Sequence, residues 1–159
     1  MSTSSKAYTE SLPKKRMGAG CLFFDEDGNV LLVKPTYKPG WEIPGGGVEH
    51  NESPKRCCQR EIQEELGLER GIANLLVVDY NGETDEKTES LMFIFDGGTL
   101  TSEDIEFIQL SRDELSEFRF FTAETLPDDM SSSLRNRVLM AWRQKTEGTD
   151  TYLENQKAT

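Results

Sequence analysis

A chain of 159 residues can bury one hydrophobic core without disulfide or zinc cross-links, so we expect a single compact domain. The 29 acidic residues outnumber the 18 basic ones, and the formal net charge is −11. Such a charge is repelled by phosphate backbones and by anionic membranes, which argues against a nucleic acid polymer or a membrane as a partner. A phosphorylated small molecule would need metal ions to offset the same repulsion.

The cysteines indicate a reducing compartment. Cys21, Cys57 and Cys58 are an odd number and two are adjacent, which suits neither a disulfide framework nor a zinc site. The polar N-terminus does not resemble a secretory signal, and no apolar run approaches the roughly 18 residues that a membrane span requires. We therefore expect a soluble, cytoplasmic protein.

Residues 1–15 are expected to form a flexible N-terminal arm, because residues 1–12 are polar and poor in large apolar side chains. A β-hairpin is predicted next. Its strands are the apolar segments Met17–Phe24 and Val30–Val33, and Asp25–Asn29 supplies the residues of a turn.

The proline-rich segment Lys34–Pro44 is predicted to be a loop over a pocket, ending in a short strand at Trp41–Ile43. Lys34 and Lys38 are candidate phosphate contacts. Trp41 is a candidate substrate contact, and its packing as a hydrophobic anchor is an equal alternative.

A helix is predicted after the glycine turn Gly45–Gly47. Ser53 is a favourable N-cap, Pro54 suits the first helical position, and Gly67 suits the left-handed residue that closes a helix. Apolar residues recur every four positions and form a buried stripe, namely Cys58, Ile62 and Leu66.

Three acidic side chains share another face of this helix. Glu61, Glu64 and Glu65 stand at offsets of three and four, so their like charges repel unless a hard divalent cation lies between them. Arg60 stands four residues before Glu64, close enough to pair with its carboxylate and to orient it.

The segment from Gly46 to Leu68 resembles the Nudix box of the Nudix hydrolase family. It reads glycine, five residues, glutamate, seven residues, then Arg-Glu-apolar-x-Glu-Glu-x-Gly-apolar, and every specified position is filled by the expected residue type. These positions are Gly46, Glu52, Arg60, Glu61, Ile62, Glu64, Glu65, Gly67 and Leu68. The resemblance implies an α/β fold, a Nudix-type α/β/α sandwich around a mixed β-sheet.

The resemblance also implies Mg²⁺ as cofactor, with Mn²⁺ as a substitute, held by Glu61, Glu64 and Glu65. Magnesium is typically bound by a few carboxylates, waters and substrate phosphate oxygens, so an acidic helix face meets its needs. Glu61 is also the candidate general base. Gly46 and Gly47 would admit a phosphate group, and Glu52 would help to fix the loop.

Further along the chain, strands are predicted over Asn74–Tyr80, over Ser90–Phe95 and around Phe118–Phe121. Members of the family often contribute another glutamate as metal ligand or base, and Glu114 is our candidate. An ordinary solvated acid is the equal alternative for this residue.

The last predicted helix is Ser133–Lys145, whose Leu134, Val138, Leu139 and Trp142 follow helical spacing. The Nudix hydrolase domain is thus expected over 16–145. A polar C-terminal tail is expected over 146–159, either frayed or forming a contact in a possible homodimer.

The predicted function is hydrolysis of a pyrophosphate bond in a nucleoside diphosphate linked to another moiety. Nucleoside triphosphates, sugar nucleotides such as ADP-ribose, and dinucleotides all remain candidate substrates. The loops Pro35–Trp41 and Asn81–Glu89 are expected to decide among them. A noncatalytic Nudix module that senses nucleotides or binds a protein is the alternative from another class, and the complete glutamate set counts against it.

Overall fold

The computed structural model describes residues 4–159, so residues 1–3 of the expected arm lie outside it. A single eight-stranded sheet has the order β6-β2-β1-β5-β4-β7-β8, with β3 paired to β1. The strands are β1 Arg16–Phe24, β2 Val30–Pro35, β3 Gly45–Gly47, β4 Leu75–Asn81, β5 Ser90–Thr99, β6 Leu115–Phe121, β7 Tyr152–Glu154 and β8 Lys157–Ala158. The helices are α1 Ser5–Ser11, α2 Pro54–Leu66, α3 Ser102–Glu106 and α4 Ser132–Glu147, with a 3₁₀ turn η1 at Ala123–Thr125.

The sheet is mixed, as predicted. β1 runs parallel to β5, and β4 runs parallel to β7, whereas the other pairings are antiparallel. The predicted hairpin forms around the carboxylate of Asp25, which accepts hydrogen bonds from the backbone N–H groups of Asp27 and Asn29.

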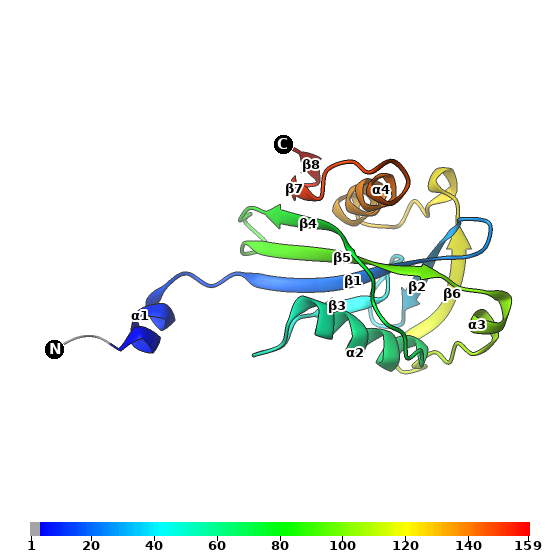
Figure 1. Cartoon of the computed structure of the whole chain (residues 1–159), viewed down its shortest axis with the longest axis horizontal. Helices are drawn as coiled ribbons and strands as arrows, with labels where there is room; N and C mark the ends of the chain where they lie inside the picture. The colour runs from blue at the N-terminus through cyan, green and yellow to red at the C-terminus, as the bar shows by residue number, and fades with distance from the viewer. Residues whose placement is uncertain (1–3) are drawn as a thin grey trace.

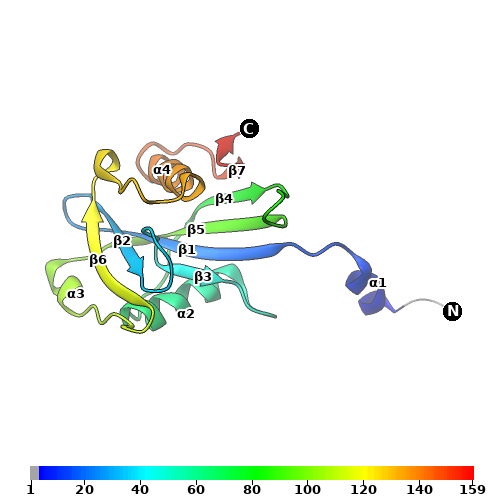
Figure 2. The same ribbon diagram turned by 180° about the vertical axis from the view of Figure 1, so that it is seen from behind.

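Two hydrophobic cores lie on opposite faces of the sheet, one under α2 and one under α4 (Figures 1 and 2). Successive strand residues point to opposite faces, so Leu22 of β1 packs on the α4 side and Cys21 packs on the α2 side. Both are completely buried. This arrangement is the predicted α/β/α sandwich.

The signals that predicted α2 act in the structure as expected. The Ser53 hydroxyl accepts a hydrogen bond from the Arg56 N–H at 3.2 Å, and Gly67 closes the helix with φ of 67°. Cys58, Ile62 and Leu66 are buried against the sheet. The acidic face of α2 therefore has a fixed orientation.

Both ends of the chain differ from expectation. Within residues 4–15 a helix, α1, begins at the N-cap Ser4, and Figure 1 shows it projecting away from the sheet. The segment 146–159 is not a frayed tail, because β7 pairs with β4 and β8 pairs with β7. Leu153 anchors it, since its side chain is completely buried in the core under α4. A single apolar anchor shows no periodicity, so the sequence pattern missed this hairpin.

One smaller expectation also changes. Trp41–Ile43 forms only one isolated bridge, between Glu42 and Val33, instead of a short strand. Trp142 of α4 packs partly buried against the core, and its ring meets Phe24 edge-on at 5.6 Å. None of the helices within residues 4–159 combines the length and hydropathy that a bilayer crossing requires.

Replacing Leu153 with alanine tests the packing of the C-terminal hairpin. Loss of this fully buried side chain should lower the free energy of unfolding by about 2 to 5 kcal/mol, because it leaves a cavity in the core. Urea denaturation measures the change. Lys157→Ala, at an exposed position of β8, should stay within about 0.5 kcal/mol of the unchanged chain. Equal stability of the two variants would mean that the hairpin is not packed.

Candidate active site

The acidic face of α2 lies against the glycine turn at β3. Glu65 is 8% exposed, and its Oε2 accepts a hydrogen bond from the Gly45 N–H at 3.0 Å. Gly46 lies directly over the Glu61 carboxylate, so that a Cβ at this position would overlap it. A side chain at position 46 would therefore displace the Glu61 carboxylate from the place it occupies beside the turn.

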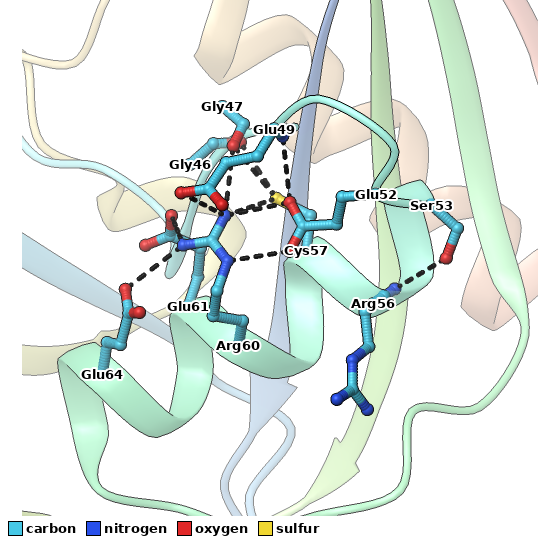
Figure 3. A network of polar contacts seen from close by, with 10 residues as sticks. All are labelled: Gly46, Gly47, Glu49, Glu52, Ser53, Arg56, Cys57, Arg60, Glu61 and Glu64. Carbon is cyan, nitrogen blue, oxygen red and sulfur yellow. Dashed lines mark hydrogen bonds and ion pairs between the residues drawn. The ribbon is translucent and has the colours of Figure 1, made fainter.

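Arg60 is the hub of the polar network on α2 (Figure 3). Its guanidinium makes a bidentate contact with the Glu52 carboxylate, in which Nε donates to Oε1 at 2.8 Å and Nη2 donates to Oε2 at 3.1 Å. Nη1 donates to Glu61 Oε1 at 2.8 Å and to Glu64 Oε2 at 3.2 Å. The expected pairing with Glu64 is present. The bidentate contact with Glu52 ties the loop before α2 to the helix.

The surroundings of Glu61 and Glu65 disfavour their charged forms. Burial raises the pKa of Glu65 to about 8, and the negative charges of Glu61 and Glu114 add to the increase. The hydrogen bond from the Gly45 N–H lowers this pKa but does not outweigh the burial. Burial also raises the pKa of Glu61, opposed by Arg60 and increased by the charges of Glu64 and Glu114. Glu114, an exposed residue on the loop before β6, contributes to both shifts through its negative charge.

Glu52 has the opposite environment. Its hydrogen bonds from Arg60, together with one from the Glu49 N–H at 2.9 Å, lower its pKa to about 2. Glu52 is therefore ionised and serves to hold Arg60 in place.

The predicted metal ligands are only partly brought together. Glu61 and Glu65 lie side by side facing the glycine turn, but the Glu64 side chain is 54% exposed and is directed at Arg60. Across residues 4–159 no three His, Cys, Asp or Glu side chains form a group that could hold a metal ion by themselves. The donor chemistry nevertheless fits Mg²⁺, which takes hard oxygen ligands and completes its shell with water and substrate oxygens.

A cavity of about 760 Å³ opens next to this acidic face. It crosses β1 and β5, between β3 on one side and β4 with the C-terminal hairpin on the other. Of the predicted substrate contacts, Gly46, Gly47 and Lys38 line it. Lys38 is bound to Glu42 through an ion pair of 2.8 Å.

Lys34 and Trp41 do not line this cavity among the described residues. Trp41 is 6% exposed and meets the ring of Phe121 edge-on at 5.1 Å. Lys34 Nζ lies 5.5 Å from the centre of the Trp41 ring. Packing as a hydrophobic anchor, the alternative considered for Trp41, is therefore what the structure shows.

The cavity has a second polar end that the sequence patterns did not identify. Arg137 of α4, Asn81 at the end of β4 and Gln156 of the C-terminal hairpin line it. The one available signal was Arg137, which stands three residues after Leu134 and directly before Val138, inside the predicted apolar stripe. A charge in a buried stripe requires a buried partner.

Solved structures define the fold class independently. A MutT NUDIX hydrolase from Burkholderia pseudomallei superimposes with a TM-score of 0.65 at 26% identity, covering 83% of this chain and 98% of that one. A MutT protein from Methanosarcina mazei gives a TM-score of 0.68 at 22% identity, covering 88% of this chain and all of the other.

The family model described as NUDIX domain matches residues 14–146, so the chain belongs to the NUDIX domain family. A curated relative is diphosphoinositol polyphosphate phosphohydrolase 2 of Rattus norvegicus, 33% identical over 85 residues, which are 53% of this chain and 48% of the relative. The match to several such relatives spans about half of their length.

The close approach of Gly46 and Glu61 can be tested with a pair of glycine variants. Gly46→Ala should displace the Glu61 carboxylate and weaken Mg²⁺ binding about 10- to 100-fold, because the orientation of a ligand controls metal affinity. Calorimetric titration with Mg²⁺ measures the affinity. Gly47→Ala places its Cβ in open space and is the comparison for fold and stability. Unchanged Mg²⁺ affinity in Gly46→Ala would show that the contact with Gly46 does not orient Glu61 for metal binding.

Acid titration tests the Arg60–Glu52 contact. The Glu52 pKa is about 2 in the folded protein and about 4.3 in an unfolded chain, so the unfolded state takes up this proton first as the pH falls. The contribution of Glu52 to stability is therefore complete above about pH 4.3 and is lost as the pH falls through about 2. As the pH is lowered from about 5 to about 2, the free energy of unfolding should fall less for Glu52→Gln than for the unchanged chain. Urea denaturation at each pH measures it. Parallel pH profiles for the two proteins would contradict the contact.

Proposed function

We propose that the chain is a metal-dependent pyrophosphohydrolase that cleaves a nucleoside diphosphate linked to another moiety. The observation that carries this proposal is the half-buried Glu61 beside the buried Glu65, both held against a glycine turn that lines a large cavity together with Glu65. The names of the relatives support pyrophosphate chemistry, since they include an RNA pyrophosphohydrolase of Hydrogenovibrio crunogenus, 37% identical over 61 residues, 38% of this chain and 37% of that protein.

Glu61, Glu64 and Glu65 would hold Mg²⁺, or Mn²⁺ in its place, and Glu114 is the candidate for a further ligand. When bound, the ion supplies charge screening for the diphosphate, polarisation of the P–O bond and a lower pKa for water. These carboxylates repel the diphosphate, so the charge of the chain itself requires a cation at this site.

The residues of the chain then have separate tasks. Glu61 accepts a proton from the attacking water as the new P–O bond forms and the bridging P–O bond breaks. Arg60 keeps the Glu61 and Glu64 carboxylates in place through its two Nη1 hydrogen bonds. In this proposal the glycine turn admits the phosphates, and Lys38, which lines the same cavity, contacts them. The products are a nucleotide and a second phosphorylated fragment or pyrophosphate.

The free, buried cysteines of the described chain suit a reducing compartment, and we propose the cytoplasm as its location. The relatives' names add diphosphoinositol polyphosphates and the RNA 5′ end to the candidate substrates. The net charge of −11 disfavours a long nucleic acid, so small phosphorylated molecules come first in a screen.

A substrate screen with Mg²⁺ tests the function. Nucleoside triphosphates, ADP-ribose, UDP-glucose, dinucleoside polyphosphates and a diphosphoinositol polyphosphate are incubated with the protein, and phosphate release is read with and without a coupled phosphatase. Turnover of at least one compound, abolished by a chelator, is expected. Complete inactivity with Mg²⁺ and with Mn²⁺ would instead favour a noncatalytic binding module.

Glu61→Gln should then lower turnover of the best substrate about 100-fold or more, because general base catalysis is lost. Glu69→Gln is the matched control, because it removes an exposed carboxylate beyond the end of α2 and outside the cavity lining of the described chain. Near-normal turnover of Glu61→Gln with metal bound would show that another residue is the base.

A further inference from the structure

The polar end of the cavity is built around a buried carboxylate. Asp79 of β4 is completely buried, and its Oδ2 accepts hydrogen bonds from Arg137 Nε at 2.8 Å and from Gln156 Nε2 at 3.1 Å. Its Oδ1 accepts a hydrogen bond from the Gln156 backbone N–H at 2.9 Å. A buried charge is stable only when it is paired and hydrogen-bonded, so Asp79 fixes both partners in position.

Gln156 occupies an unfavourable backbone position. It follows Asn155 in the two-residue turn between β7 and β8. The φ angle is 49° at Asn155 and 62° at Gln156. Turns of this kind favour Asn followed by Gly, because glycine adopts positive φ without steric cost. A glutamine here costs conformational energy, which its contacts with Asp79 and Asn81 offset.

The network leaves two hydrogen-bonding atoms available. Arg137 donates from Nε to Asp79 and from Nη2 to Asn81, and within residues 4–159 its Nη1 makes no hydrogen bond. A carboxylate only accepts, so Gln156 must present its Nε2 to Asp79, and its Oε1 has no partner among the same residues. The end of the cavity therefore offers a donor on Arg137 and an acceptor on Gln156.

The walls beside these groups are apolar. Met92 and Leu134 line the cavity, and Met92 lies over Gly18, where a Cβ would come within 2.7 Å of its sulfur. Methionine side chains adapt their shape to flat and irregular ligands. A flat ring with polar atoms on its edge would place its faces against these side chains and its edge against the polar end.

We propose that Arg137 and Gln156 bind the hydrogen-bonding edge of the nucleobase and so determine which base the site prefers. This inference rests on the proposed function. A nucleobase carries donors and acceptors side by side on its edge, whereas a phosphate carries acceptors and would be repelled by Gln156 Oε1. The positive charge of Arg137 is already balanced by Asp79, which also disfavours an anion at this position.

Binding measurements separate the base from the rest of the nucleotide. AMP, GMP, CMP and UMP are compared by calorimetric titration with ribose 5-phosphate, which carries the same sugar and phosphate without a base. At least one nucleotide should bind about tenfold more tightly than ribose 5-phosphate, the effect of one or two well-made hydrogen bonds. Arg137→Lys and Gln156→Gly should each reduce this preference about tenfold.

The variants are chosen so that loss of fold does not imitate loss of recognition. Gln156→Gly removes the side chain and relieves the positive φ, so thermal unfolding should stay close to that of the unchanged chain. Lys157→Ala, the exposed neighbour of Gln156, should keep the preference for the nucleotide.

Equal binding of all nucleotides and ribose 5-phosphate, or a preference that survives in both variants, would overturn the inference. Inositol hexakisphosphate is the competing probe, because Arg16 and Lys87 also line the cavity. Its tighter binding, weakened by Arg16→Ala and Lys87→Ala, would assign this end to an anionic group instead. The titrations need no turnover, so a base-dependent preference in a chain that hydrolyses nothing would support the base site and contradict only the proposed function.

Discussion

The contact between Arg60 and Glu52 is the interaction on which the site depends. Helix α2 carries several carboxylates close together, and like charges at helical spacing destabilise a helix. One guanidinium balances them, because its fork holds Glu52 while Nη1 holds Glu61 and Glu64. The same group donates to the Gly47 carbonyl at 3.3 Å and so connects the glycine turn to the helix. A lysine could not make all of these contacts, since it lacks the planar fork.

The sheet converts this local network into a site. Burial of the apolar stripe of α2 fixes which way Glu61 and Glu65 point, and β3 pairs with β1 to bring the glycine turn over them. The cavity lining runs from Glu65 and the glycine turn, past the first residues of β1 and β5, to Leu134 and Arg137 of α4 on the opposite face. The phosphate end and the polar end are therefore supported by different helices on one sheet.

The sequence predicts those features that depend on local spacing. Residues close together in the sequence determine the caps of α2, its buried stripe, the hairpin and the spacing of the glutamates. The positions of Lys34 and Trp41 could not be predicted in this way, because a tryptophan in a proline-rich loop fits a pocket and a core equally well. The C-terminal hairpin and the Asp79 network were missed for a related reason. They depend on pairings between residues far apart in the chain, such as Asp79 with Gln156.

The two ends of the cavity are encoded in separate parts of the chain. The carboxylates come from α2 and the loop before β6, whereas the polar end comes from β4, α4 and the turn at Asn155 and Gln156. Under the proposed base recognition, substitutions in that turn would change which base is preferred without altering the carboxylates of α2. Homologous proteins with an identical box can in this way diverge in substrate, and resemblance within the box alone is a poor guide to which metabolite each one consumes.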